Sequence, residues 1–221
     1  MAGLVLLNDQ RIDKPGTSIK QDSPLRIKTK SKPFASRAGM KLEGAFKAYD
    51  LDVSGKIALD LGASTGGFTD CMLKRGAEKV YAVDVGTNQL VYQLRIHPKV
   101  VSLEKTHARK LSRDNIPQAI EFLTVDVSFT SLTYVLPPVL PLLAPTATGI
   151  LLFKPQFEAP REKVGVGGIV EDAVASEAAE TMEKWFAENQ IQVLGKMKSP
   201  VKGRDGNQEY LYWVELHGPA L

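Results

Sequence analysis

Four charged residues stand where their types and surroundings point to chemistry. Lys154 follows four apolar residues and precedes a proline, and a charge in such a buried place needs a partner; the alternative is that Lys154 extends to solvent at a strand end. Asp126 ends one strand-like run, Glu209 opens another, and Lys41 lies in the segment Ser36–Leu42. Amines and carboxylates can give and take protons, so these residues are candidates for acid–base chemistry.

A glycine-rich turn joins a buried strand to a helix in residues 56–70, which read KIALDLGASTGGFTD. Three residues separate Gly62 from Gly66, whereas a dinucleotide site needs G-x-G-x-x-G. Asp60, at the strand end, would repel a pyrophosphate. An amino group, an adenosine ribose and a carboxylate fit better, and S-adenosylmethionine has all three. Its carboxylate would take the free amides near Gly66 and Gly67.

A second acidic residue, Asp84, ends the next strand 18 positions after Gly66. An acid at this place binds ribose hydroxyls, although on its own it is equally explained as a strand cap. With the glycine turn upstream, we predict an S-adenosylmethionine site. Its predicted contacts are Asp60, Gly62, Ala63, Ser64, Thr65, Gly66, Gly67, Phe68, Asp84 and Asp126.

The composition limits the class of protein. The chain has 221 residues, of which 43% are hydrophobic, and no apolar run reaches the length of a membrane span. Residues 1–8 lack the basic start of a signal peptide. The single cysteine, Cys71, excludes an internal disulfide and a cysteine zinc cluster, and it is expected to fill the core. The three histidines show no ligand spacing. These features predict a cytoplasmic enzyme that uses no metal.

Positive charge is concentrated near the N-terminus. Residues 1–47 hold ten Lys and Arg against four Asp and Glu, a net +6, while residues 48–221 hold 18 against 21, a net −3. A basic leader on a nearly neutral body fits a polyanion partner. A solvated tail explains the charge equally well.

Alternating strand and helix patterns predict an α/β fold with a Rossmann-like methyltransferase sheet and a C-terminal antiparallel hairpin. Residues 4–30 read as a small β module with turns at 8–10 and 14–17, followed by an amphipathic helix at 38–50. The expected strands are 57–61, 80–85, 100–104, 122–127, 149–154, 191–197 and 208–216, and the expected helices are 130–143, broken or kinked by Pro137-Pro138, and 173–189. The loop at 161–168 is either a substrate lid or an ordinary mobile loop.

Along the chain the motifs SRAGMKL, DLGASTGGFTD, AVDVG, DVSF, FKPQFE and GNQEYL follow one another. Their order and spacing resemble those of the TlyA-type proteins, which are described both as haemolysins and as ribosomal RNA 2′-O-methyltransferases. The catalytic domain of that family is similar to FtsJ/RrmJ RNA methyltransferases. The match covers about residues 31–217, with Ala38 where the family usually has glycine. Residues 3–30 resemble the second half of the RNA-binding module named after ribosomal protein S-four.

The resemblance implies two domains and an activity. Residues 1–30 would be a partial RNA-binding module without its opening helices, and residues 31–221 a methyltransferase domain. The family's Lys-Asp-Lys-Glu tetrad falls on Lys41, Asp126, Lys154 and Glu209. Lys154 would act as the base or orient the hydroxyl, which a neighbouring lysine assists by favouring the neutral amine. Asp126 would orient Lys154, while Lys41 and Glu209 would position the ribose.

The expected partner is RNA, in particular ribosomal RNA or ribosomal subunits, with no membrane and no metal. Candidate RNA-binding residues are Arg37, Arg161, Lys163, Lys202 and Arg204. Two other functions remain as alternatives: a haemolysin-type membrane-active protein, and a catalytically silent fold that only binds RNA. A base methyltransferase would be expected to carry an Asn/Asp-Pro-Pro-aromatic motif after the fourth strand, where this chain reads DVSF.

Overall fold

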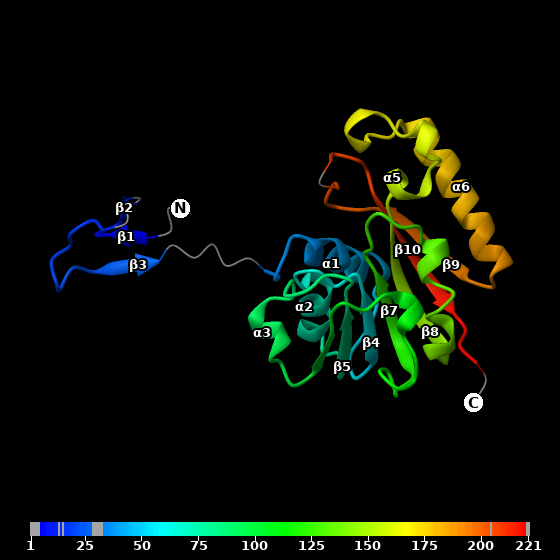
Figure 1. The fold of residues 1–221 in the computed structure, drawn as a ribbon, viewed down its shortest axis with the longest axis horizontal. Helices are drawn as coiled ribbons and strands as arrows, with labels where there is room; N and C mark the ends of the chain where they lie inside the picture. The colour runs from blue at the N-terminus through cyan, green and yellow to red at the C-terminus, as the bar shows by residue number, and fades with distance from the viewer. Residues whose placement is uncertain (1–4, 13, 15, 28–32, 204, 220–221) are drawn as a thin grey trace. The chain divides into compact units, whose positions relative to one another are not determined.

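A seven-stranded sheet carries the predicted site (Figure 1). Its strand order is β6-β5-β4-β7-β8-β10-β9, in which β6 to β8 run parallel and β10 pairs antiparallel with both β8 and β9. The predicted α/β sheet with a C-terminal hairpin is confirmed. The strands are β4 (Ile57–Leu61), β5 (Lys79–Val83), β6 (Val100–Leu103), β7 (Ile120–Val125), β8 (Leu143–Phe153), β9 (Gln192–Lys198) and β10 (Tyr210–Leu216).

The structure is a computed structural model that describes residues 5–12, 14, 16–27, 33–203 and 205–219. The helices are α1 (Ala38–Tyr49), α2 (Gly67–Lys74), α3 (Tyr92–Arg95), α4 (Leu132–Val135), α5 (Pro155–Glu158) and α6 (Asp172–Glu188). Short 3-10 turns lie at η1 (Ala108–Lys110), η2 (Leu140–Leu142), η3 (Arg161–Lys163) and η4 (Val166–Gly168). The chain divides into two units, residues 1–33 and 34–221. The predicted division between residues 30 and 31 lies outside the described residues.

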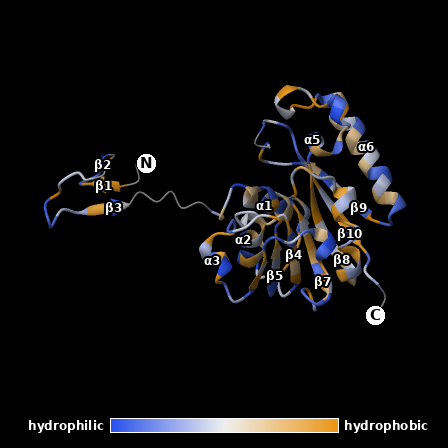
Figure 2. Ribbon diagram, viewed as in Figure 1, coloured by the Kyte–Doolittle hydropathy of each residue, from blue (hydrophilic) through white to orange (hydrophobic). Residues whose placement is uncertain are grey.

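Each face of the large sheet is covered by its own apolar cluster. In β4, Leu59 points into the cluster that α4 and α6 complete, whereas Ala58 points into the cluster of α1 and α2. This alternation follows from the two-residue period of a strand. Figure 2 shows hydrophobic residues along the central strands of this unit. Cys71 is fully buried in the α1–α2 cluster, as expected of a core residue.

Several boundaries differ from the sequence prediction. The helix expected at 130–143 is interrupted at Pro137 and Pro138, as predicted, but it is shorter than expected, because only α4 forms before the prolines and the turn η2 after them; proline lacks the amide hydrogen that an α-helix needs and clashes with the preceding turn. Strand β8 starts at Leu143, earlier than predicted. Strand β7 ends at Val125 and β10 starts at Tyr210, so Asp126 and Glu209 each lie one residue outside a strand.

The N-terminal unit contains a three-stranded antiparallel sheet in the order β2-β1-β3. Its strands are β1 (Val5–Leu7), β2 (Gln10–Ile12) and β3 (Leu25–Ile27). Asn8 and Asp9 make the predicted turn with φ of 46° and 64°, which is the left-handed geometry of a tight hairpin. Strand β2 was not predicted, because Gln10 and Arg11 are polar and a single apolar residue, Ile12, shows no alternation.

Candidate active site

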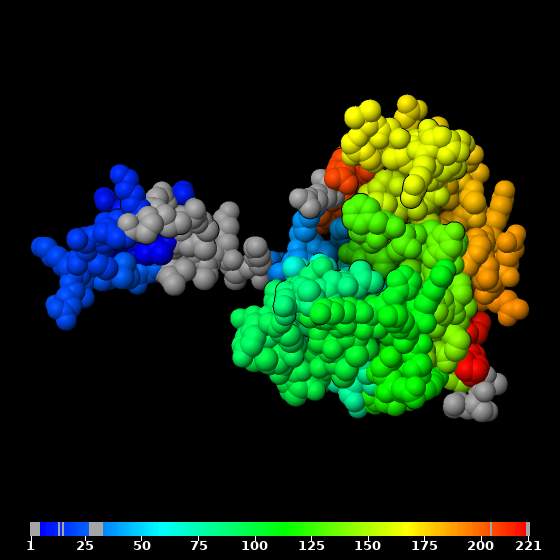
Figure 3. Space-filling view, in the orientation of Figure 1, coloured from blue at the N-terminus to red at the C-terminus, as the bar shows by residue number. Residues whose placement is uncertain are grey.

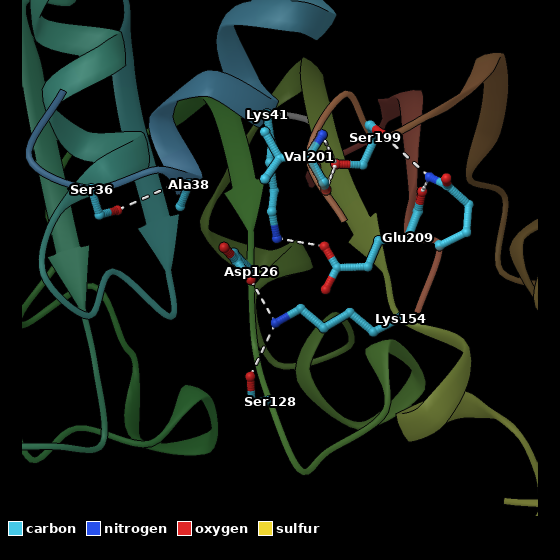
Figure 4. A network of polar contacts seen from close by, with 10 residues as sticks. Ser36, Ala38, Lys41, Asp126, Ser128, Lys154, Ser199, Val201 and Glu209 are labelled. Carbon is cyan, nitrogen blue, oxygen red and sulfur yellow. Dashed lines mark hydrogen bonds and ion pairs between the residues drawn. The ribbon is translucent and has the colours of Figure 1, made fainter. Parts of the chain in front are cut away.

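The predicted catalytic residues surround one cavity at the carboxyl edge of the sheet. The cavity has a volume of about 520 Å³, and all four members of the predicted tetrad line it. Lys41 and Lys154 are each 7% exposed and Glu209 is 3% exposed. Two lysines and two carboxylates, distant in sequence, therefore meet where ligands bind in open α/β sheets. Figure 4 shows their side chains converging.

Lys154 is held by the segment that follows β7. Its Nζ lies 2.6 Å from Asp126 Oδ1 and donates a 3.0 Å hydrogen bond to Ser128 Oγ. Asp126 is the first residue after β7 and Lys154 the first after β8, and these strands are parallel neighbours. An ammonium carries three donors, so one N–H of Lys154 is left for a ligand in the cavity.

Lys41 and Glu209 form the second pair, with Lys41 Nζ hydrogen-bonded to Glu209 Oε2 (Figure 4). Lys41 comes from the first turn of α1, and Glu209 lies just before β10. The backbone carbonyl of Glu209 accepts a 2.8 Å bond from the amide of Ser199. A Cβ on Gly203 would lie 2.8 Å from Glu209 Oε1, so the hairpin loop also packs against this carboxylate.

The glycine turn is shaped by two positions that need glycine. Gly62 has φ +85°, and a Cβ there would lie 2.4 Å from the carbonyl oxygen of Asp126. Gly66, before α2, has φ +93°, and a Cβ there would lie 2.3 Å from Leu94 Cδ1. Side chains at such φ values are strained in any case. The turn residues that line the catalytic cavity are Gly62, Ala63, Ser64, Thr65, Gly67 and Phe68, whereas Gly66 does not.

The start of α1 packs directly on the start of α2. A Cβ added to Gly39 would lie 2.8 Å from the carbonyl oxygen of Gly67, and a Cβ added to Gly67 would lie 2.9 Å from the amide nitrogen of Gly39. The two main chains approach closely here, and the side chains of Phe34 and Ser36 fill the remaining space, 2.5 and 2.3 Å from those added Cβ atoms. The helix that carries Lys41 is therefore seated on the glycine turn.

Asp84 borders a second cavity of about 320 Å³ that shares Gly62, Ser64, Asp126, Ser128 and Phe129 with the first. Its Oδ2 accepts a 2.8 Å bond from the amide of Ser64, and its Oδ1 a 2.7 Å bond from that of Gly86. A carboxylate has about four acceptor positions, so Asp84 can also accept bonds from hydroxyl groups. Sequence reasoning missed other residues that line this second cavity. They lie in the segments after β5, β6 and β7 and are Val85, Gln89, Thr106, His107, Ala108 and Val127.

Asp60 differs from its predicted role as a direct cofactor contact. It is fully buried and lines neither cavity. Thr69 Oγ1 donates to its Oδ2 at 2.6 Å and Thr124 Oγ1 to its Oδ1 at 3.0 Å. Side chains alternate along β4, and Asp60 points toward α2, beside Thr124 in register. Burial raises the pKa of Asp60 to about 7. Asp60 thus fixes the strand beneath the turn.

An exposed aromatic ring marks the cavity mouth. Phe129 is 91% exposed and has φ +62°, a strained conformation for a side-chain-bearing residue. Its ring centroid lies 5.1 Å from that of Phe157. Both rings also line an adjoining groove of about 770 Å³ with Arg161, Gly167 and others. Figure 3 shows the yellow segment of residues 160–170 beside the green segment near residue 130. The sequence signal was an aromatic residue in the loop after a strand-end aspartate.

Two partly or fully buried polar residues hold these loops in place. Glu158 Oε1 accepts a 2.9 Å bond from the amide of Leu132, and burial raises the pKa of Glu158 to about 7. Asn207 donates to the carbonyl of Gly168 at 2.7 Å and accepts from the amide of Val170 at 3.0 Å. Both stand in quoted motifs, FKPQFE and GNQEYL, but their roles depend on contacts across the fold that spacing does not give.

The candidate RNA-binding residues fall in different places. Arg37 lines the catalytic cavity and Arg161 the adjoining groove. Lys163 Nζ lies 2.6 Å from Glu177 Oε2, so its charge is paired. Lys202 is exposed in the hairpin loop. Arg204 lies outside the described residues.

The described residues contain neither a cluster of metal ligands nor a membrane-spanning helix. Within residues 5–12, 14, 16–27, 33–203 and 205–219, no group of three or more His, Cys, Asp and Glu side chains has the arrangement of a metal site. No helix in that part of the chain has both the length and the apolar character needed to cross a bilayer.

Comparison with known proteins gives a consistent family. The profile of the FtsJ-like methyltransferases matches residues 34–216. A Bacillus subtilis protein named "Putative rRNA methyltransferase YqxC" is 45% identical, over 100% of this chain and 78% of its own. The Mycobacterium tuberculosis 16S/23S rRNA (cytidine-2′-O)-methyltransferase TlyA is 39% identical, over 96% of this chain and 80% of its own.

A solved structure extends the likeness to the fold. The "putative hemolysin" of Streptococcus thermophilus superposes with a TM-score of 0.82 at 42% identity, over 99% of this chain and 81% of its own. The resemblance inferred from the motifs is confirmed. The sheet order, the cavity and these relatives agree, and the chain belongs to the FtsJ-like methyltransferase family.

Proposed function

We propose that the protein is an S-adenosylmethionine-dependent 2′-O-methyltransferase of ribosomal RNA. One observation carries the proposal: two lysine–carboxylate pairs, Lys154–Asp126 and Lys41–Glu209, lie in one cavity beside the glycine turn. A hydroxyl is a weak nucleophile that must be positioned and deprotonated, which is the chemistry such pairs supply. The name of the TlyA relative, a cytidine-2′-O-methyltransferase of rRNA, supports ribosomal RNA as substrate and cytidine as target.

The cavity walls fit the cofactor. Asp84 keeps free acceptor positions for the ribose hydroxyls of an adenosine, and the cavity of about 320 Å³ beside it takes the adenine. The first turn of α2 leaves amide donors suited to a carboxylate near Gly67. When bound, S-adenosylmethionine supplies an electrophilic methyl group on its sulfonium. The residues that line both cavities lie where the adenosine side meets the catalytic side; they are Gly62, Ser64, Asp126, Ser128 and Phe129.

The protein's own residues then handle the target hydroxyl and its proton. The third position of Lys154 Nζ, beyond its contacts with Asp126 and Ser128, faces the 2′-hydroxyl and holds it in line for attack. The neutral Nζ takes the proton of the hydroxyl as the new O–C bond forms and the C–S bond of the sulfonium breaks, and Asp126 Oδ1, 2.6 Å away, stabilises the ammonium that results. Lys41 and Glu209 border the same cavity and fix the ribose.

The cavity mouth suits a nucleotide drawn out of an RNA strand. The 91% exposed ring of Phe129, backed by Phe157, offers a flat surface on which a base can stack, a common mode of single-strand recognition. Arg37 in the cavity and Arg161 in the adjoining groove provide positive charge for the flanking phosphates.

A direct assay tests the proposal. Purified protein is incubated with S-adenosylmethionine and either ribosomal subunits or rRNA transcripts, and the digested nucleosides are identified by mass spectrometry. We expect a 2′-O-methylated nucleoside, and none when the target residue is a 2′-deoxynucleotide. A methyl group found on a base, or transfer to the deoxy substrate, would contradict the assignment.

A further inference from the structure

Gln156 has a buried oxygen atom that makes no hydrogen bond with the proposed catalytic residues or with any other described residue. It lies in α5, two residues after Lys154, and it lines both the catalytic cavity and the adjoining groove. Its Oε1 is enclosed by the protein, yet no group among the described residues donates a hydrogen bond to it. A buried carbonyl oxygen without a donor is uncommon and destabilising. The oxygen therefore gains a donor if the carboxamide turns and a ligand in the cavity supplies one.

The neighbours of Gln156 in the same turn are already engaged. Lys154 bonds Asp126 and Ser128, the ring of Phe157 contacts that of Phe129, and Glu158 accepts from the amide of Leu132. Those contacts fix the backbone of α5 against the segment after β7. The carboxamide is thus attached to a rigid turn, at the boundary between the catalytic cavity and the groove.

This position matches the base of the target nucleotide. Lys154 is assigned to the 2′-oxygen, and the base is attached to the ribose carbon next to the one that bears this oxygen. The base must then extend from Lys154 toward the exposed ring of Phe129. Gln156 follows Lys154 in the chain and shares two cavity walls with Phe129, so its amide faces the edge of a base stacked there. Rotation about the last side-chain torsion, which is broad for an amide, turns Oε1 into the cavity.

We propose that Gln156 reads the edge of the target base, with Oε1, turned into the cavity, accepting a hydrogen bond from an exocyclic amino group. This inference rests on the proposed function. Cytosine presents this amino donor beside an acceptor nitrogen, whereas uracil presents the reverse pattern. Gln156 would thereby favour cytidine over uridine at the site of methylation.

A double-mutant cycle, with Gln156 changed in the protein and the amino group removed from the target base, tests the proposed hydrogen bond. The substrates are one RNA with cytidine at the target, the same RNA with a 2-pyrimidinone nucleoside that lacks only the amino group, and a uridine version. For the wild type, removing the amino group is expected to lower kcat/KM about tenfold, the size of one good hydrogen bond. For Gln156→Ala, the cytidine substrate should lose about as much, and removing the amino group should have little further effect.

Two further variants separate recognition from a general structural effect. Gln156→Glu keeps an acceptor oxygen and should restore part of the preference for the amino group. Gln93→Ala, at an exposed position of α3 outside these cavities, should retain the full wild-type discrimination. The affinity for S-adenosylmethionine, measured by calorimetry, shows whether each variant keeps its cofactor site.

The outcomes distinguish the two levels of proposal. No 2′-O-methylation of any of the three RNAs by the wild type would count against the proposed function itself. Methylation of the cytidine and 2-pyrimidinone RNAs at equal rates would overturn the role of Gln156, as would equal sensitivity of wild type and Gln156→Ala to removal of the amino group. A preference for uridine would show that the amide is turned the other way and would also overturn it.

Discussion

Lys154 and Asp126 are joined by a 2.6 Å contact between Nζ and Oδ1, across the ends of two neighbouring parallel strands. Each residue is the first one past its strand, where the chain leaves the sheet but the strand still fixes its position. The pair therefore belongs to the rigid edge of the sheet rather than to a mobile loop. Precise placement of this kind is what an in-line methyl transfer requires.

Replacing Lys154 should separate chemistry from cofactor binding. Lys154→Ala removes the group that holds the hydroxyl, so methyl transfer should fall below detection while the affinity for S-adenosylmethionine changes less than about threefold, because Lys154 acts on the nucleophile. Lys154→Arg should also fail, since arginine does not give up its proton. Single-turnover transfer and calorimetry measure the two quantities, with Lys110→Ala as an exposed lysine control. Substantial transfer by Lys154→Ala would contradict the role.

Asp84→Ala should weaken cofactor binding. The variant loses the acceptor for the ribose hydroxyls and leaves the amides of Ser64 and Gly86 without their present partner. We expect a loss of about 1–3 kcal/mol of binding free energy, which is roughly five- to 150-fold in Kd. Calorimetry with S-adenosylhomocysteine measures it. Asp84→Asn keeps one acceptor oxygen, so its affinity for S-adenosylhomocysteine should lie between those of the wild type and Asp84→Ala. An unchanged affinity in Asp84→Ala would show that Asp84 does not bind the cofactor.

Gly62→Ala tests the close approach of two strand ends. An added Cβ would meet the Asp126 carbonyl at 2.4 Å, in addition to the strain at φ +85°. Gly55 is a matched control, because its φ is +70° but nothing lies within 4 Å of an added Cβ. Strain alone costs about 1–2 kcal/mol, so Gly55→Ala should lose about that much stability in urea unfolding. Gly62→Ala should lose more and should also lose activity. Equal losses in both variants would show that the contact has no effect.

Asp60 should make stability depend on pH in a defined direction. Its pKa is raised from 3.8 to about 7 by burial. Between these values the folded protein binds a proton that the unfolded chain has released, so the free energy of unfolding falls as pH rises and levels off above about 7. Asp60→Asn keeps an acceptor for Thr69 but removes the titration. The stability of Asp60→Asn minus that of wild type should rise from pH 4 to pH 7, whereas the exposed variant Gln93→Ala should show a constant difference.

Deleting residues 1–33 should reduce the salt dependence of RNA binding. These residues hold seven Lys and Arg against three Asp and Glu, and each phosphate contact contributes about −0.7 to the slope of log K against log salt for single strands. Filter binding at several salt concentrations gives the slope for both chains. The same slope before and after deletion would show that the leader is not an RNA-binding arm.

The sequence predicted the parts of the site whose residue type was unusual for its position. A lysine after four apolar residues, a glycine turn with D-x-G-x-x-x-G spacing and an acid after the next strand were enough to find Lys154, Gly62 and Asp84. The ion pair of Lys41 with Glu209 connects segments far apart in the chain and was not predicted; the family resemblance indicated only that both residues belong to the site. Asp60 was predicted to contact the cofactor from its position in the motif alone. Side chains alternate between the two faces of β4, and this alternation turns the Asp60 side chain toward α2 instead.

The paired helix starts at Gly39 and Gly67 limit what this seam can accept. The two main chains approach closely, and the side chains of Phe34 and Ser36 fill the space beside them, so neither position has room for a larger residue. Lys41, two residues after Gly39, is therefore fixed relative to the glycine turn, and a displacement of the turn would displace Lys41 with it.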